Sequence, residues 1–156
     1  MDAPRWLVDE MLGRLARYLR FLGQDTAYAK GRSDEEIRDW ALREGRILVT
    51  RDRLLARRTA GSILIRSVVL ADQLRAVRDA FPSLELQVQF VRCTLCNGRL
   101  EPAEPTAPEE QSGLPKPAEP AARGPVYICR ECHHSYWEGS HTSRIRRTIA
   151  EVLGTP

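Results

Sequence analysis

Short apolar runs alternate with amphipathic stretches through the first 90 residues of the chain. Apolar runs of strand length predict strands at residues 6–8, 26–29, 46–50 and 63–65. Apolar residues that recur every three or four positions predict helices at residues 11–22, 33–45, 54–59 and 70–81. Strict alternation of apolar and polar residues predicts a half-buried edge strand at residues 84–90. This order predicts an α/β fold, a mainly parallel sheet with helices on both faces.

The second predicted helix carries recognisable signals at both ends. Ser33 followed by Glu36 is the capping-box pattern that begins a helix, and Gly45 is the residue type that ends one. Asp34 therefore lies in the first helical turn, where the helix dipole favours a negative charge. That placement explains an acidic residue at this position even if it has no catalytic role.

The chain changes character after residue 91. Residues 99–125 hold seven of the ten prolines and show no apolar period, so a disordered or extended loop is expected at about residues 100–125. All four cysteines also lie in this second part. We therefore expect three parts, which are an α/β domain at 1–91, a zinc ribbon at 92–141, and a C-terminal helix and tail at 142–156.

Residues 142–153 are predicted to form a helix with one apolar stripe and one basic face. The stripe consists of Ile145, Ile149 and Val152. We expect this stripe to pack on the first domain. A phosphate-binding ridge is the alternative role for the helix, and its arginines are Arg144, Arg146 and Arg147.

The cysteines form two C-x-x-C pairs, Cys93 with Cys96 and Cys129 with Cys132. Each pair presents two thiolates about one tetrahedral edge apart, and two pairs close a tetrahedron that leaves no position open for water. The pattern therefore predicts one structural zinc ion. The 32 residues between the pairs form a long connection, but a flexible loop lengthens at small entropic cost. Disulfides are the alternative, and they are disfavoured because the sequence shows no secretion signal.

Three aromatic residues flank the second cysteine pair, and they are Tyr127, Tyr136 and Trp137. A small ribbon has few other apolar side chains, so these rings are predicted to make up its core. Stacking on nucleic-acid bases is the alternative.

Composition adds a preference for nucleic acid as a partner. The formal net charge is +3, and 22 of the 24 basic residues are arginine, whose planar fork of donors suits phosphate oxygens. A high-GC genome or heat adaptation would enrich arginine as well. No stretch approaches the roughly 20 apolar residues of a membrane span. We therefore expect a cytoplasmic protein without a membrane partner.

Three aspartates are candidates for a divalent metal site. In a parallel sheet, ligands bind at the carboxyl ends of the strands. Asp9 directly follows the first strand, Asp52 follows the third, and Asp34 opens the helix between them. If these carboxylates converge, they repel one another unless a hard cation neutralises them, and magnesium or manganese is the natural choice. A turn or capping role is the alternative for each residue.

Six segments of the chain form an ordered set of motifs, and they are residues 7–23 (LVDEMLGRLARYLRFLG), 33–37 (SDEEI), 45–52 (GRILVTRD), 92–98 (RCTLCNG), 129–132 (CREC) and 136–141 (YWEGSH). This set resembles the Mut-seven C-terminal nuclease family, which joins a PIN-like domain to a zinc ribbon. The resemblance covers nearly the whole chain apart from the proline-rich loop.

The resemblance implies a ribonuclease that hydrolyses RNA phosphodiester bonds through a divalent ion. Asp9, Asp34 and Asp52 take the places of the PIN-like acidic residues, with magnesium or manganese as catalytic cofactor and zinc as structural cofactor. PIN nucleases commonly gather a fourth acid, for which Asp72 and Glu10 are the candidates.

Three arginines are candidate contacts to RNA phosphates, and they are Arg14 and Arg17 on the first helix and Arg51 beside Asp52. A solvated helix face is the alternative reading of the first two. The competing function is a non-catalytic RNA- or protein-binding module that uses the ribbon and the arginine surface. The sequence leaves open whether the chain forms homo-oligomers and whether the cleavage is endonucleolytic.

Overall fold

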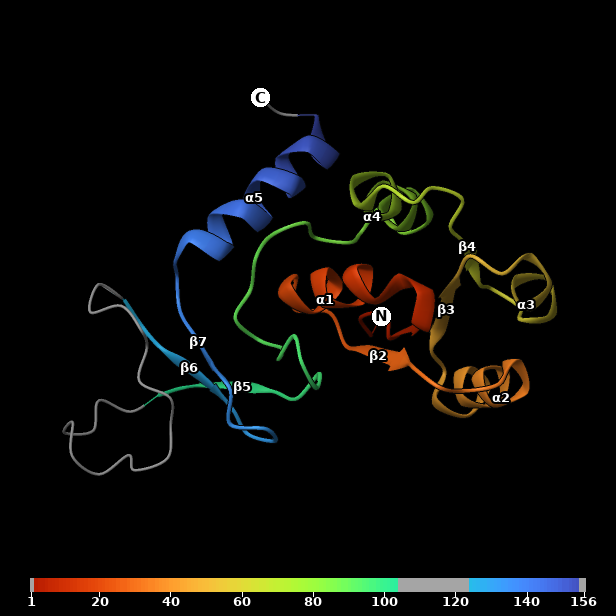
Figure 1. Ribbon diagram of the computed structural model, residues 1–156, viewed down its shortest axis with the longest axis horizontal. Coiled ribbons are helices and arrows are strands. Elements are labelled where there is room, and N and C mark those ends of the chain that lie inside the picture. The colour runs from red at the N-terminus through yellow and green to blue at the C-terminus, as the bar shows by residue number, and fades with distance from the viewer. Residues whose placement is uncertain (1, 104–123, 155–156) are drawn as a thin grey trace.

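The first part of the chain is built on a parallel sheet. A computed structural model describes residues 2–103 and 124–154. The sheet has four strands in the order β2-β1-β3-β4, and every neighbouring pair runs parallel. The strands are β1 (Trp6–Asp9), β2 (Thr26–Ala29), β3 (Ile47–Thr50) and β4 (Ile63–Leu64). The order places β1 in the centre, next to β3, as Figure 1 shows.

Helices cover both faces of this sheet, which confirms the predicted α/β class. They are η1 (Glu10–Leu12), α1 (Gly13–Phe21), α2 (Asp34–Glu44), α3 (Arg53–Arg58), α4 (Leu70–Ala80) and α5 (Ser140–Leu153). Successive residues of β1 point to opposite faces. Val8 therefore packs with α1, α4 and α5, whereas Leu7 packs with α2 and α3. No helix in the described ranges is long and apolar enough to cross a membrane.

The last helix returns to the core of the first domain. Ile145, Ile149 and Val152 belong to the same buried cluster as Leu74 and Val77 of α4. This confirms that the apolar stripe packs on the first domain. The cysteine ribbon is therefore held at both of its ends, by the segment that leaves α4 and by the helix that packs against α4 (Figure 1).

The predicted edge strand at residues 84–90 is wrong, because these residues form no strand. Leu84 is buried and packs with Leu86 and Val88 in the core that α1 covers, whereas Phe90 packs on the ribbon. The backbone N–H of Gln89 donates to the Phe21 carbonyl at 2.8 Å. Gly23, at φ +75°, permits this approach, since a Cβ there would lie 2.8 Å from Gln89 Oε1. Alternation shows that one side of a segment is buried, but it does not require a ladder of hydrogen bonds.

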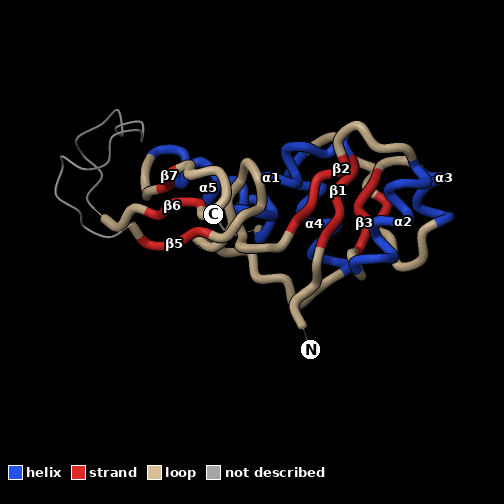
Figure 2. Tube along the Cα trace, turned by 90° about the horizontal axis from the view of Figure 1, so that it is seen from below, coloured by secondary structure: helices blue, strands red, loops and turns tan. Residues whose placement is uncertain are grey.

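The cysteine ribbon has a small antiparallel sheet of its own, in the order β5-β6-β7. Its strands are β5 (Leu100–Pro102), β6 (Tyr127–Cys129) and β7 (Ser135–Tyr136). Figure 2 shows this sheet to one side of the parallel sheet. The loop was expected at about residues 100–125, but residues 100–102 form β5 instead. Residues 104–123 lie outside the described part of the chain.

Candidate functional site

The two C-x-x-C pairs come together in the ribbon. The four sulfurs all lie within 4.8 Å of one another. Cys93 Sγ is 3.6 Å from Cys132 Sγ, and Cys96 Sγ is 3.5 Å from Cys129 Sγ. Zn–S bonds of about 2.3 Å in a tetrahedron require an edge of about 3.8 Å. The cluster therefore has the size of a four-cysteine zinc site, and no disulfide joins these cysteines.

Hydrogen bonds from the protein support negative charge on these sulfurs. Tyr136 Oη lies 3.0 Å from Cys93 Sγ, and burial raises the pKa of Tyr136, so the phenol keeps the proton that it shares with the sulfur. Burial opposes ionisation of Cys93, but the hydrogen bonds from Tyr136 and from backbone N–H groups outweigh it and lower the pKa of Cys93 to about 7. Burial and the neighbouring thiols raise the pKa of Cys96 to about 12. A zinc ion at this site would hold all four cysteines as thiolates, because metal binding displaces their protons.

Gly98 is the residue that leaves room for the sulfurs. A Cβ at this position would lie 2.8 Å from Cys129 Sγ and 3.2 Å from Cys96 Sγ. Its backbone N–H also donates to Cys96 Sγ at 3.4 Å. Any side chain here would push the two cysteine pairs apart.

All three aromatic residues were predicted to form the core of the ribbon, and two of them, Tyr127 and Tyr136, do so. Tyr136 is 6% exposed and packs with the buried cysteines. Tyr127 stacks on Phe90, with ring centroids 5.0 Å apart. Trp137 is only half-buried, and its ring meets His141 edge-on at 6.1 Å.

A buried arginine attaches the first cysteine pair to the α/β domain. The guanidinium of Arg20, on α1, donates to the carbonyl oxygens of Thr94 and Leu95 at 3.0 and 3.2 Å. Its Nε donates to the Thr26 carbonyl at 2.9 Å. Burial lowers the pKa of Arg20, while the nearby thiols act to raise it. Four thiolates and one Zn²⁺ carry a net charge of −2, so a buried cation beside them is electrostatically favoured.

A second contact joins the ribbon to the domain through Asp25. Asn97, at φ +67°, donates from Nδ2 to Asp25 Oδ1 at 2.9 Å and accepts from the Thr26 N–H at 2.9 Å. Arg46 donates to the same Asp25 oxygen at 2.8 Å. Burial raises the pKa of Asp25, but the hydrogen bonds from Arg46 and Asn97 outweigh it and lower the pKa to about 2.

We expect Asp25→Asn to destabilise the protein in a pH-dependent way. Breaking hydrogen bonds to a charged group costs about 1–3 kcal/mol. The pKa of Asp25, about 2 in the folded state, lies below the roughly 3.9 of an unfolded aspartate. Its contribution is therefore complete above about pH 4 and is lost as the pH falls toward 2. Urea unfolding of both proteins should show a difference at pH 6 that narrows at pH 2.5.

Asp39→Asn is the matched control for this test. Asp39 is exposed on α2, and its carboxylate has no ion pair or hydrogen bond within the described ranges. It should change stability little at either pH. If Asp25→Asn lowered the free energy of unfolding equally at both pH values, the claim that the negative charge of Asp25 stabilises the fold would be contradicted.

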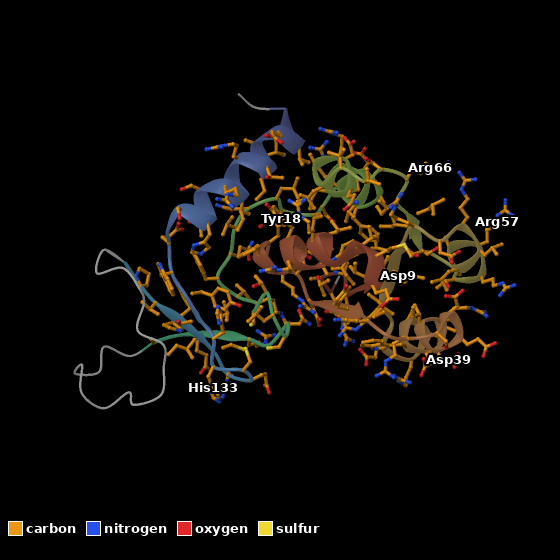
Figure 3. All side chains as sticks on the ribbon, viewed as in Figure 1. Asp9, Tyr18, Asp39, Arg57, Arg66 and His133 are labelled. Carbon is orange, nitrogen blue, oxygen red and sulfur yellow. The ribbon has the colours of Figure 1, made fainter. Side chains whose placement is uncertain are left out.

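The acidic candidates lie at the carboxyl end of the parallel sheet, and two of them are directly linked. Asp9 is 5% exposed at the end of β1, and its Oδ2 accepts a hydrogen bond from Thr50 Oγ1 at 2.6 Å. The same hydroxyl accepts from the Asp52 N–H at 3.0 Å. Asp52 in turn caps α3, since its Oδ1 accepts from the N–H groups of Leu54 and Leu55 at 2.8 and 3.0 Å. Thr50 thus fixes the Asp9 carboxylate relative to the start of α3, beside the first helix in Figure 3.

Asp34 comes to the same edge from the other side of β1. It is the first residue of α2, which follows β2, and β2 neighbours β1. Ser33 caps this helix with Glu36 in the predicted capping box, so Asp34 is not needed as the cap. Its carboxylate is exposed and has no hydrogen bond or ion pair in the described part of the chain.

The three carboxylates are less crowded than the sulfurs. Among the described residues, the cysteines alone form a group of three or more metal-ligating side chains within 4.8 Å of one another. Of the candidates for a fourth acid, Asp72 is engaged by Arg75 at 2.7 Å and by Ser67 at 2.9 Å. Glu10 directly follows Asp9 and accepts from the Gly31 N–H at 3.1 Å. Of the two candidates for the fourth acid, Glu10 is therefore the nearer to Asp9 along the chain.

The candidate arginines Arg14, Arg17 and Arg51 are all exposed. Arg51 lines a hollow of about 190 Å³ together with Arg53 and Arg66. Arg14 and Arg17 line another hollow, of about 200 Å³, between α1 and α5. None of these side chains has an ion pair within residues 2–103 and 124–154.

Several residues of the site were not foreseen from the sequence, and they are Arg20, Asp25, Thr50 and Asn97. Thr50 lies inside the motif that ends at Asp52, but nothing in its neighbours along the chain indicates a bond to Asp9. Asn97 follows a cysteine pair. Asparagine adopts a positive φ more readily than most residues, which is sufficient reason for its presence there. The sequence therefore gives no sign that its side chain bonds to a distant segment. Each role depends on a contact between distant segments.

An α/β domain with acidic residues at the carboxyl edge of its sheet, joined to a ribbon whose four cysteines lie at the spacing of a zinc site, defines a class of α/β proteins with a cysteine ribbon. Within that class, residues 4–149 match the Mut7-C RNAse domain, so the chain belongs to this family, as the sequence motifs indicated. No curated protein and no solved structure matches the chain. Membership in a family of RNase domains supports a nuclease function.

Proposed function

We propose that the protein is a metal-dependent ribonuclease in which Asp9, Asp34 and Asp52 hold a catalytic magnesium or manganese ion. The observation that carries the proposal is the link from Asp9 through Thr50 to Asp52, at the carboxyl ends of two neighbouring strands. Carboxylates at this edge of a parallel sheet occupy the usual ligand position. Family membership supplies RNA as the substrate class.

The residues suit a hard divalent ion. Oxygen ligands are those that magnesium and manganese prefer, and a carboxylate has about four lone-pair positions. Asp52 uses Oδ1 for capping, which leaves Oδ2 available. Magnesium usually keeps several waters and takes only one or two carboxylates directly. A carboxylate spacing wider than that of the sulfurs is therefore compatible with such an ion, which Asp9, Asp34 and Asp52 would hold together with water.

The side chains of this edge have separate tasks in hydrolysis. Asp9, Asp34 and Asp52 would hold the divalent ion, which would supply a bound water of lowered pKa and offset charge on the leaving oxygen. The Thr50 hydroxyl keeps Asp9 in place, and the N–H groups of Leu54 and Leu55 orient Asp52. Arg14, Arg17 and Arg51, which have no ion pair among the described residues, present their guanidinium groups to RNA phosphates. No side-chain nucleophile is required.

We propose a structural role for the zinc site. Cys93, Cys96, Cys129 and Cys132 fill all four tetrahedral positions, so a zinc ion there keeps no open position for a substrate. The site holds the ribbon together and, through Arg20 and Asn97, holds it against the α/β domain.

Cleavage assays test this proposal directly. Zinc-loaded protein, dialysed free of other divalent ions, should leave single-stranded and structured RNA intact and should cleave RNA when Mn²⁺ or Mg²⁺ is added. RNA binding without cleavage under every one of these conditions would instead support the non-catalytic binding module. Cleavage that is the same without added ions would contradict the metal-dependent mechanism.

A further inference from the structure

A groove between α1 and α5 combines basic and aromatic side chains. It encloses about 200 Å³, and its lining includes Arg14, Arg17, Tyr18 and Phe21 of α1 and His141 and Arg144 of α5. Figure 3 labels Tyr18 between these two helices. No acidic residue of the described chain lines the groove.

The arginines of this groove are not used by the protein itself. Arg14, Arg17 and Arg144 are exposed, and their guanidinium groups have no ion pair or hydrogen bond in the part of the chain that is described. By contrast, Arg146 on the same helix donates to Glu138 at 2.7 Å. Three free cations on one groove attract a polyanion, and the guanidinium fork matches phosphate oxygens.

The aromatic side chains offer a flat surface beside those cations. Tyr18 and Phe21 are half-buried, and their rings meet edge to face with centroids 6.1 Å apart. Both residues also line the groove itself, next to Arg14 and Arg17. Aromatic rings beside arginines are the usual platform for an unpaired base, because every base has a π face.

The groove continues toward the acidic edge. Arg14 also lines a second hollow, of about 340 Å³, together with Glu10, Met11 and Val68. Met11 and Val68 are 52% and 73% exposed, so this hollow presents apolar surface as well. Glu10 directly follows Asp9. Because Arg14 lines both hollows, an RNA strand in the groove has a connected path toward the proposed catalytic carboxylates.

We infer that the α1–α5 groove binds single-stranded RNA, with one unpaired base stacked on Tyr18 and neighbouring phosphates held by Arg14, Arg17 and Arg144. This inference rests on the proposed function and names the substrate class as unpaired RNA. A duplex hides its base faces within its own stack, so only a single strand can use the ring. The basic face of α5 thus acts together with α1.

Binding measurements that do not depend on cleavage test this groove. The full-length, zinc-loaded Asp52→Asn protein keeps RNA intact, and anisotropy of a fluorescein-labelled ten-nucleotide strand then reports affinity over a range of salt concentrations. Arg144→Gln should reduce the slope of log affinity against log salt by about 0.7, the value for one lost phosphate contact to a single strand. Arg43→Gln is the matched control, because Arg43 is exposed on α2 at the end opposite to Asp34.

The stacking role has its own pair of variants. Tyr18→Leu should weaken binding at least about fivefold, the lower limit for losing one base stack, whereas Tyr18→Phe should keep it. A 2-aminopurine in the strand should lose fluorescence on binding to the Tyr18 protein and not to the Leu variant. The duplex of the same sequence should bind more weakly than the strand.

Two results would overturn the proposal that this groove binds single-stranded RNA. They are an Arg144→Gln slope equal to that of Arg43→Gln, and equal affinity for strand and duplex. Groove-dependent binding in a protein that never cleaves RNA would overturn the proposed function and leave the groove supported. Cleavage of RNA together with binding that does not depend on the groove residues would support the proposed function and overturn the role of the groove.

Discussion

Asp52→Asn should reduce RNA cleavage at least about a hundredfold and leave the stability of the protein almost unchanged. The asparagine keeps the Oδ1 that accepts from Leu54 and Leu55, so α3 remains capped. Only the Oδ2 that is free for a metal is replaced, by an amide nitrogen that cannot serve as a ligand. The variant therefore separates the proposed catalytic role of Asp52 from its role as the cap of α3.

Asp9→Asn should lose activity to a similar extent and should also lose stability. Both oxygens of Asp9 accept hydrogen bonds, from the Glu10 N–H at 2.8 Å and from Thr50 at 2.6 Å. The amide group of asparagine would meet one of these donors and leave it without an acceptor, which costs about 1–3 kcal/mol at a buried site. Relief of repulsion among the carboxylates would act in the opposite direction.

Initial rates with Mn²⁺ and melting temperatures measured on the same preparations check both expectations. Asp39→Asn removes the same charge from the exposed face of α2 and should keep full activity. Asp34→Asn should lower activity if Asp34 contributes to the ion, and should leave it unchanged if the helix dipole is its only role. Full metal-dependent activity in an Asp9→Asn, Asp52→Asn double variant would disprove the catalytic assignment.

Cys129→Ser should abolish zinc binding and loosen the ribbon while the parallel sheet stays folded. Zinc ligation supplies the folding energy of so small a sheet. Without zinc, the segment between Cys93 and Cys96 also loosens, and its Thr94 and Leu95 carbonyls no longer accept from buried Arg20. A buried charge without partners costs about 3–5 kcal/mol. We therefore expect a melting temperature lower by on the order of 10 °C.

Hydrogen exchange locates this change. Amides of β5, β6 and β7 should lose protection, whereas β1, β3 and α5 should keep it, because α5 is held to α4 by Ile145, Ile149 and Val152. Wild-type protein stripped of zinc should behave like the variant, and added zinc should restore only the wild type. A single cooperative transition of the whole chain would show that residues 1–91 and 92–141 are not separate domains.

The local pattern of the chain contains much of its architecture. Runs of apolar residues and helical spacing predict β1 to β4 and the helices, since each depends on neighbours within a few positions. The cysteine spacing predicts that the four sulfurs cluster, because two C-x-x-C pairs commonly bind one zinc ion in a tetrahedron. Asp9 and Asp52 are predicted at one edge because they follow strands of a parallel sheet, and β1 does neighbour β3.

Tertiary structure decided what each of these groups touches. Thr50 joins Asp9 across 41 residues and Arg20 reaches Thr94 across 74, distances over which no local pattern selects a partner. The alternation at residues 84–90 predicted burial of one side correctly but not its partner, which is a helical layer instead of a strand. The groove that brings Tyr18 to Arg144 likewise exists only because α5 packs back on the first domain. A sequence determines which side of an element avoids water, whereas the packing of distant elements determines what that side meets.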